Sequence, residues 1–419
     1  MEGMVMAHPV NQINACEVCG SKELTCVLDL GPHPMCDDLV PIGDSRVCRE
    51  YRIEIMFCGQ CFTAHQHFQV PQQDLFPKTY HYRTRFTADL LKGMEGLAAS
   101  CKKRFGDLDG KKVLDIGSND GSLLDFFQKQ GAVTYGLEPT DAYLDAEQKG
   151  HVIFNDFLTE KSADAIVFAH GKPDFITSTN AVAHMEDLKG VLNSIKRLMS
   201  PHTVVIIENN YLGSVLDNNQ FDQFYHEHLR AYSYTSFIHI ARFLGVSILG
   251  AEFPSQHGGN IRVFMGNIAS AAQDTVDLNK LNTRENRFID DFITLRTNMT
   301  LWRKNKKIFI EQQVRQHGKL KAKAFPGRAA ILLRLLELNE NLLSAVYEKT
   351  GSLRIGYYVP GTRIPICSDN ELFALPDKTS PLLNLAWHIP REIRTYLKEH
   401  GCNGPVLDIL NIEDFPSKQ

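Results

Sequence analysis

Short apolar runs alternate with stretches of helical periodicity through the middle of the chain. The clearest runs, each of a length that predicts a buried β-strand, cover residues 112–116, 134–137, 174–178 and 203–208. After the first run, residues 123–127 carry four apolar side chains at a spacing that favours a helix with one buried face. Strands that alternate with helices are typical of a doubly wound α/β fold with a mostly parallel sheet.

The pattern is different on either side of this region. Residues 1–86 are rich in cysteine, proline and histidine, and a short strand is expected at residues 51–57. A helical stretch covers about residues 276–320, and further alternating segments follow it. A chain of 419 residues is too long for one average domain. We therefore expect three domains, at residues 1–86, 87–248 and 249–419.

A glycine-containing turn follows the first central strand and reads Asp115-Ile116-Gly117-Ser118-Asn119-Asp120-Gly121. Glycine lets the backbone turn with positive φ or approach a ligand closely, and open α/β sheets bind ligands at the carboxyl ends of their strands. The spacing differs from the Gly-x-Gly-x-x-Gly pattern that cradles a pyrophosphate, so the turn suits a ligand without phosphate. An ordinary tight turn between strand and helix is the simpler alternative.

An acidic residue ends the second central strand. Glu138 lies 23 positions after Asp115, where a carboxylate can bind both hydroxyls of a ribose. Together, the turn and the acid resemble the site of a class I S-adenosylmethionine methyltransferase. In such a site the turn would hold the amino-acid part of the cofactor, Glu138 the ribose, and Asp156 would lie near the adenine. The candidate cofactor residues are Asp115, Gly117, Ser118, Asn119, Gly121, Glu138, Asp156 and Asn180.

Composition and charge narrow the range of partners. The chain is 43% hydrophobic and 22% charged, as is typical of a soluble globular protein. A net charge of −4 gives no basic field for nucleic acid, so a small molecule is the expected partner. The sequence has neither a run approaching the roughly 20 apolar residues of a membrane span nor a secretion signal near its start. We expect a cytoplasmic protein without membrane contact, and a monomer, with the oligomeric state left open.

Four of the ten cysteines form two Cys-x-x-Cys pairs, Cys16 with Cys19 and Cys58 with Cys61. Disulfides are disfavoured in a chain of this expected location. Two such pairs can supply four thiolates to one tetrahedral Zn²⁺. Four thiolates leave no open coordination position, so we expect the metal to be structural. The rival ligands, each more simply interpreted as a core or surface residue, are Cys26, Cys36, Cys48, His33, His65 and His67.

The densest group of chemically active side chains reads Tyr225-His226-Glu227-His228-Leu229-Arg230-Ala231-Tyr232. Histidine titrates near neutrality, tyrosine can donate to an oxyanion, and a carboxylate can orient a histidine, so these residue types suit proton transfer. A surface turn with incidental polar residues is the alternative. The position after the strand at 203–208 favours the cofactor cleft, and His184, which follows the strand at 174–178, can face the same cleft.

In this order, the motifs resemble the sugar C-3-methyltransferases, which act on nucleotide-linked keto-deoxysugars in antibiotic and surface-polysaccharide pathways. That family combines an N-terminal zinc domain with two Cys-x-x-Cys pairs, a methyltransferase domain with a Tyr-His-Glu-His segment, and a C-terminal Rossmann-like domain. The ordered matches run from about residue 12 to 395 and include the segments at 257–263 and 359–366.

The resemblance implies carbon methylation next to a keto group. His228 would remove the proton at C-3, and the resulting enolate would attack the methyl group. Tyr225, Glu227 and His184 would polarise the keto oxygen or position the base, and Tyr80 would reach the sugar from the zinc domain. Two alternatives remain open: an O- or N-methyltransferase acting on another small molecule, and a non-catalytic zinc-containing interaction protein.

Two segments depart from the family pattern. Members commonly carry a glycine-rich phosphate turn at the start of the C-terminal domain, whereas this chain reads Lys323-Ala324-Phe325-Pro326-Gly327-Arg328-Ala329-Ala330 there. Proline and Arg328 can still frame a phosphate site, with Arg328 as a bidentate partner. Because only one glycine remains in this segment, the nucleotide or its pose is expected to differ. Residues 80–85 also carry more arginine than the resemblance implies.

Overall fold

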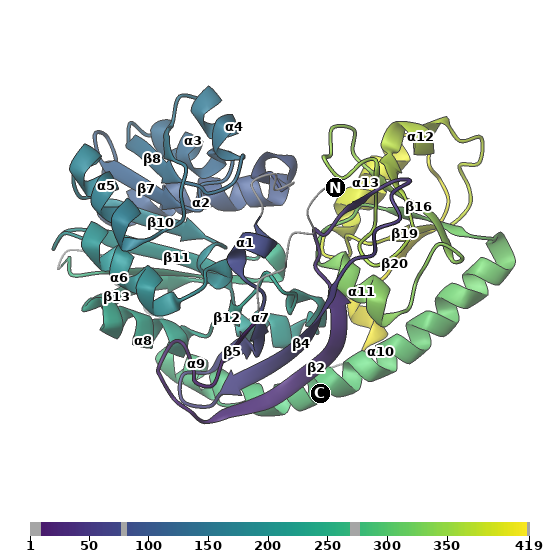
Figure 1. The fold of residues 1–419 in the computed structure, drawn as a ribbon, viewed down its shortest axis with the longest axis horizontal. Coiled ribbons are helices and arrows are strands. Elements are labelled where there is room, and N and C mark those ends of the chain that lie inside the picture. Colours follow the sequence, from purple (N-terminus) through teal and green to yellow (C-terminus); the bar gives the residue numbers. More distant parts are fainter. Residues whose placement is uncertain (1–9, 77–81, 269–276, 417–419) are drawn as a thin grey trace, which may run out of the picture. The chain divides into compact units, whose positions relative to one another are not determined.

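The computed structural model describes residues 10–76, 82–268 and 277–416, which divide into two compact units (Figure 1). The first unit contains residues up to 26, 55–215 and 227–289, and the second contains 27–54, 216–226 and the chain from 290 onward. Each unit is described by itself.

A seven-stranded sheet in the order β13-β14-β11-β10-β7-β8-β9 forms the centre of the first unit (Figure 1). The strands are β7 (Lys112–Ile116), β8 (Val133–Leu137), β9 (Val152–Phe154), β10 (Phe175–Thr179), β11 (Val204–Asn210), β13 (Ser247–Glu252) and β14 (Asn260–Gly266). The five strands from β11 to β9 are parallel, and β14 runs antiparallel to both β11 and β13. All four strands predicted in the centre of the chain are confirmed, as is the doubly wound α/β fold with a mostly parallel sheet.

Helices cover this sheet because each presents an apolar stripe. They are α2 (Ala88–Phe105), α3 (Ser122–Gln128), α4 (Tyr143–Gln148), α5 (Glu160–His170), α6 (Leu188–Leu198), α7 (Leu212–Asp217) and α8 (Tyr234–Leu244). Leu97 and Cys101 of α2 and Phe127 of α3 pack with Val113 and Phe264 in one buried cluster. Strand order reverses between β7 and β10, which makes their carboxyl ends the place where such a sheet binds ligands.

The cysteine-rich segment contributes strands to a second, four-stranded sheet in the order β12-β5-β4-β2. Its strands are β2 (Leu24–Pro34), β4 (Glu50–Cys58), β5 (Thr63–Gln66) and β12 (Arg230–Ala231). The strand predicted at 51–57 is confirmed as β4. Within the first unit, β12 pairs antiparallel with β5, with Arg230 opposite His65. This pairing joins the cysteine-rich segment directly to the end of the segment that contains His226 and His228.

A five-stranded parallel sheet in the order β18-β16-β15-β19-β20 forms the second unit. The strands are β15 (Leu320–Lys323), β16 (Leu343–Glu348), β18 (Ile366–Ser368), β19 (Leu382–Asn384) and β20 (Val406–Asp408), and the helices are α11 (Ala329–Leu335), α12 (Asp369–Ala374) and α13 (Pro390–Glu399). Strand order reverses between β15 and β19, so the C-terminal sheet has the expected Rossmann-like form. The helical stretch expected at 276–320 consists of α9 (Leu278–Glu285) and α10 (Phe288–His317).

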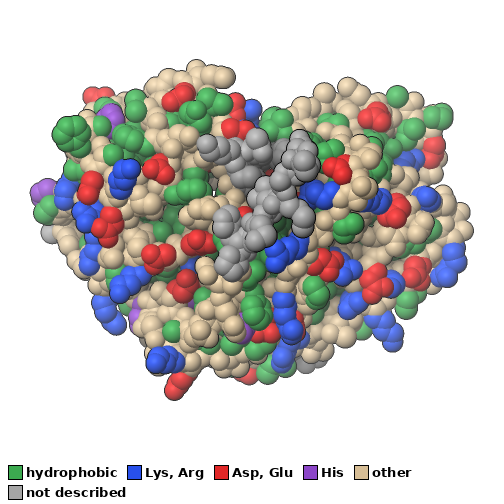
Figure 2. All heavy atoms as spheres, in the orientation of Figure 1, with side chains coloured by type: hydrophobic (Ala, Val, Ile, Leu, Met, Phe, Trp, Pro, Cys, Tyr) green, Lys and Arg blue, Asp and Glu red, His purple; other side chains and the backbone are tan. Residues whose placement is uncertain are grey.

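The three domains proposed from the sequence follow the motifs that each part of the chain contains. The two compact units follow packing, so the two divisions use different criteria. The proposed limit at 248/249 falls within β13, whose partner β14 also belongs to the first sheet. None of the helices in the described ranges is long and apolar enough to cross a membrane. Acidic and basic side chains are interspersed on the face drawn in Figure 2.

Candidate active site and metal centre

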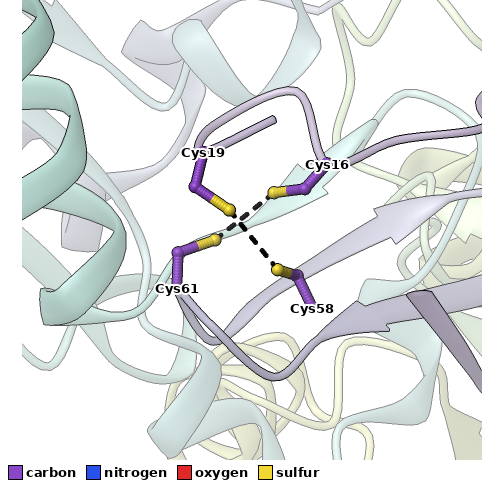
Figure 3. A group of neighbouring side chains, drawn as sticks. All are labelled: Cys16, Cys19, Cys58 and Cys61. Carbon is purple, nitrogen blue, oxygen red and sulfur yellow. Dashed lines mark hydrogen bonds between the residues drawn. The ribbon is translucent and has the colours of Figure 1, made fainter. Parts of the chain in front are cut away.

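The four knuckle cysteines converge on one point in the first unit (Figure 3). Their sulfur atoms all lie within 4.8 Å of one another, with Cys16 Sγ 3.3 Å from Cys61 Sγ and Cys19 Sγ 3.5 Å from Cys58 Sγ. A tetrahedral zinc with bonds of about 2.3 Å places its sulfur ligands about 3.8 Å apart, so the donor set fits the ion. Four thiolates fill its coordination shell. The centre is therefore a structural Zn²⁺ site, as predicted.

The rival ligands lie outside this cluster. Among the residues that the structure describes, only the four knuckle cysteines gather three or more potential ligand atoms around one position. His65 comes nearest, with its Nε2 3.3 Å from Cys16 Sγ, and it contacts a ligand without joining the cluster. A buried histidine beside a metal ligand is a typical outer-shell partner that orients the thiolate.

The predicted glycine turn has the geometry that only glycine tolerates. Gly117 and Gly121 have φ angles of 77° and 73°. An added Cβ at Gly117 would lie 2.6 Å from the Cβ of Ala181, and one at Gly121 would lie 2.8 Å from Cδ2 of His151. The turn therefore packs closely against the segment after β10, and its backbone needs both glycines.

Two buried carboxyl groups flank this turn. Asp115 Oδ1 accepts a hydrogen bond of 2.7 Å from Thr177 Oγ1 on the neighbouring β10, and burial raises the pKa of Asp115 to about 7. Glu138 accepts from the Asn119 backbone N–H at 2.9 Å and from the Thr140 hydroxyl at 2.5 Å, and burial raises its pKa as well. Glu138 Oε1 also accepts from the Thr140 backbone N–H at 2.9 Å, which fills both lone pairs of that oxygen. One lone pair of Oε2 is left for a ribose hydroxyl while Glu138 holds the turn.

The remaining cofactor candidates lie at the ends of neighbouring strands. Asn180 directly follows β10 with a φ of 54°, and its Oδ1 accepts from Asn260 Nδ2 at 3.2 Å. Asp156 follows β9, is exposed, and accepts from the Phe157 N–H at 2.8 Å. Asn155 Nδ2 donates to the Glu138 carbonyl at 2.8 Å, which ties the end of β9 to the end of β8. The carboxyl edge thus gathers these residues, and their roles toward the cofactor remain a proposal.

A segment that the sequence did not single out for the cofactor site contacts the glycine turn. The backbone N–H of Thr84 donates to Asn119 Oδ1 at 3.0 Å, and that of Arg85 donates to Asp120 Oδ2 at 2.9 Å. Arg83 pairs with Asp141 and also with a second carboxylate, Asp145, each at 2.7 Å. The Arg85 side chain also pairs with Asp145, with Nη1 2.9 Å from Oδ2, so Asp141 and Asp145 account for the unexpected arginines at 83 and 85. In the sequence, Asp141 and Asp145 were the available signal for these ion pairs, since buried arginines need carboxylate partners.

His184 and His228 come together in the first unit. His184 ends the short turn η2 (Val182–His184) after β10, and its Nδ1 lies 2.5 Å from the Glu227 carbonyl oxygen, to which it donates. The rings of His184 and His228 have centroids 4.9 Å apart and are tilted by 44°. Burial lowers the pKa of His184 to about 4, so this imidazole is neutral near pH 7. The structure thus places Glu227 beside the pair through its backbone carbonyl.

The other predicted catalytic residues lie either in the second unit or outside the described residues. Tyr225 and His226 belong to the second unit, and Tyr80 lies outside the described residues. His226 is 1% exposed, and its Nε2 donates to the Tyr51 carbonyl at 3.0 Å. Burial lowers the pKa of His226 to about 4. These contacts give His226 a packing role in the second unit.

Arg328 has a protein partner where the sequence suggested a phosphate. Its Nε and Nη2 each lie 2.7 Å from an oxygen of Asp222, and Trp387 Nε1 donates to the same carboxylate at 2.8 Å. Arg328 is only 8% exposed. Asp222 thus occupies the guanidinium face that a phosphate would need, which corrects the expectation. No local pattern indicates a partner 106 positions away in the sequence.

Three family models match the chain in succession. A putative zinc binding domain matches residues 16–76, a methyltransferase domain matches residues 89–249, and a C-methyltransferase C-terminal domain matches residues 255–406. The first match contains all four knuckle cysteines, and the second contains the glycine turn and the histidine pair.

Curated relatives differ in how much of the chain they resemble. C-methyltransferase NovU of Streptomyces niveus is 26% identical over 406 residues, which cover 95% of this chain and 96% of that protein. A ubiquinone biosynthesis O-methyltransferase of Pasteurella multocida is 29% identical over 110 residues, covering 23% of this chain and 46% of that protein. Three domain models in order and a C-methyltransferase similar along nearly the whole length lead to one conclusion. This chain is an S-adenosylmethionine-dependent methyltransferase that combines a zinc-binding domain, a methyltransferase domain and a C-methyltransferase C-terminal domain.

Proposed function

We propose that this enzyme methylates C-3 of a nucleotide-linked 4-keto deoxysugar. The observation that carries the proposal is the pairing of His184 and His228 at the carboxyl edge of the methyltransferase sheet. A C–H bond next to a carbonyl is a weak acid, so its deprotonation needs a positioned base and donors aimed at the developing oxyanion. Transfer of a methyl group to a hydroxyl or amine needs less of this machinery.

His228 is the proposed base. The Nδ1–H of His184 is held by the Glu227 carbonyl, which fixes the tautomer and the orientation of that ring. Because the low pKa keeps His184 neutral, it adds no positive charge that would oppose protonation of His228. His228 can therefore take the C-3 proton while its neighbour stays neutral. Tyr225 and Tyr80 remain proposed donors to the keto oxygen.

The cofactor is proposed to bind along the carboxyl edge of the same sheet. Residues 117–121 would hold its amino-acid part, Glu138 its ribose, and Asp156 would lie near its adenine. S-adenosylmethionine supplies an electrophilic methyl group that the substrate carbanion attacks directly. The residues of this chain bind and align the two reactants, since the reacting atoms must be held at about 3–3.5 Å in line.

Product connectivity tests the proposal against its alternative, O- or N-methylation of another small molecule. A panel of nucleotide-linked 4-keto deoxysugars is incubated with the enzyme and S-adenosylmethionine, and NMR locates the new methyl group. We expect a new carbon–carbon bond at C-3, and no reaction with the matching 4-hydroxy sugars, whose C-3 proton is not acidified. A methyl group on oxygen or nitrogen, or turnover of the 4-hydroxy sugars, would refute C-methylation by this route.

A further inference from the structure

A buried ion pair lies between the metal centre and the histidine pair. The side chain of Arg230 is fully buried, and its Nη1 lies 2.7 Å from Glu17 Oε2. The same oxygen accepts from Gln69 Nε2 at 2.8 Å, and Arg230 Nε donates to Tyr232 Oη at 3.1 Å. Burying two charges brings little net stability on average, so a pair held in this way suggests a role in fixing geometry.

Glu17, the acidic member of this ion pair, lies beside the metal centre. Glu17 directly follows the ligand Cys16 in the chain. His65 lies between them in space, with Nε2 3.3 Å from Cys16 Sγ and Nδ1 3.6 Å from Glu17 Oε2. The metal fixes Cys16, and a fixed Cys16 restricts where the Glu17 carboxylate can lie.

The other member of the ion pair, Arg230, is attached to the histidine pair. Arg230 is two residues after His228, and its Nη2 donates to the carbonyl oxygen of Met185, the residue after His184. Backbone bonds reinforce the same junction, since the Leu229 N–H donates to the Ala183 carbonyl at 2.9 Å. One guanidinium group thus binds both segments that carry the histidines.

We infer that Glu17 and Arg230 are positioning residues, through which the zinc centre sets the relative orientation of His184 and His228. The inference rests on the proposed function for its effect on catalysis, but its geometric part stands on the contacts alone. With the metal bound, Glu17 holds Arg230, and Arg230 holds the Met185 carbonyl and the His228 segment together. Loss of the carboxylate charge leaves a buried cation without its counter-ion, so the segment around His184 rearranges.

Glu17→Gln tests this link with a side chain of nearly the same shape. We expect zinc content near one ion per chain and cofactor affinity within about twofold of the parent, because neither site loses a direct ligand. We expect kcat to fall about 10- to 100-fold, a typical cost of losing an outer-shell partner, with little change in KM. Glu160→Gln is the matched control, because it removes a charge that pairs with Arg197 on the exposed surface of the same unit. This variant should change neither kcat nor KM.

A second measurement does not depend on activity. In ¹⁵N-histidine-labelled protein, the His184 signals, assigned by their loss in His184→Gln, should report a single tautomer protonated at Nδ1. Glu17→Gln should convert them to a mixture, and removing zinc from the parent with a chelator should cause the same change, reversed by added zinc. Arg230→Lys, which keeps the charge but cannot reach all its acceptors, should behave like Glu17→Gln.

Several outcomes separate this link from the proposed function. If the His184 signals change as expected but the product carries no C-methyl group, the link stands and the proposed reaction fails. If C-methylation is found but zinc removal and Glu17→Gln leave the His184 signals unchanged, the link is wrong. Activity that falls only in proportion to lost zinc or lost folded protein also overturns it. If both variants fail to fold, the chelation and zinc-return experiment on the parent decides.

Discussion

The two doubly wound sheets of this enzyme each reverse strand order at their first strand, yet the two junctions are built differently. In the first unit, β7 leads through residues 117–121 into α3, and in the second, β15 leads through residues 324–328 into α11. Both are the place where doubly wound sheets bind ligands. A comparison of the two junctions therefore separates what the topology provides from what the side chains add.

The first junction is shaped by glycine, whereas charged side chains that pair within the protein fill the second. Lys323, at the end of β15, is buried with its Nζ 2.7 Å from Asp369, and Tyr396 donates to the same carboxylate at 2.7 Å. Arg328 is held by Asp222 in the bidentate manner described above. The positive charges of the second junction are thus satisfied within the protein. Topology offers a ligand position in both sheets, but side chains decide which one is available.

The largest expected effect is on the chemistry at the first junction. His228→Asn should retain both ligands but lose about 10²–10⁴-fold in rate, the usual contribution of a positioned general base. Exchange of the substrate C-3 hydrogen with deuterated solvent, followed by NMR, tests the same step without methyl transfer. Exchange that persists undiminished would assign the base elsewhere, with His184 or Tyr225 next. His226→Asn is the control and should reduce the rate less, since His226 packs against Tyr51.

At the second junction, the expected effect is on stability. Arg328→Ala leaves Asp222 buried without its partner, which should cost about 3–5 kcal/mol in the free energy of unfolding. KM for the nucleotide sugar should not change in protein that remains folded. Arg334→Ala, which removes an exposed pair with Glu50 in the same unit, should cost less than about 1 kcal/mol. A selective rise in KM with normal stability would instead show that Arg328 binds the substrate.

The next expected effect is a loss of cofactor affinity at the first junction. Glu138→Ala should weaken S-adenosylmethionine binding by about 2–3 kcal/mol, because it removes charge-assisted hydrogen bonds to the ribose. Calorimetry measures this directly, with circular dichroism as the check that the variant is folded. Unchanged affinity in a folded variant would exclude Glu138 from the cofactor site.

Asp115 gives the first junction a distinct pH dependence. Its pKa rises from 3.8 to about 7 on burial, so the folded state holds its proton more tightly than the unfolded chain does. This group therefore stabilises the protein most below about pH 4, and its contribution is lost as the pH rises toward about 7. Asp115→Asn should be more stable than the parent at pH 8 by on the order of 2 kcal/mol, with no gain at pH 4. Chemical denaturation at the two pH values measures the difference, and equal effects at both would contradict the assignment.

A matched pair of glycine substitutions gives the smallest and most direct test. Gly121→Ala forces a left-handed backbone and a Cβ contact of 2.8 Å, so it should cost at least about 1–2 kcal/mol in stability and weaken cofactor binding. Gly327→Ala meets only an ordinary contact of 3.4 Å to Cys36 Cβ and should be tolerated. Thermal unfolding and cofactor titration compare the two. Equal tolerance would remove the structural distinction between the junctions.

The sequence by itself determined the parts that depend on short-range pattern. The four central strands were predicted because a buried parallel strand requires a continuous apolar run. The glycine turn was predicted because a left-handed backbone at a strand end selects glycine. The zinc ligands followed from the spacing of Cys16 with Cys19 and Cys58 with Cys61, which brings two sulfurs of one turn to the same ion.

Only the tertiary structure decided which distant residues meet. Asp222 reaches Arg328 across 106 positions, and Glu17 reaches Arg230 across 213. Both arginines are buried, where a cation needs a counter-ion because water is largely excluded. The sequence does not show which of the many carboxylates in the chain supplies that counter-ion. The register of β5 against β12 and the close packing after β10 select the partner that is used. Local pattern determined the strands, the glycine turn and the zinc ligands, whereas long-range packing determined which buried charges are paired.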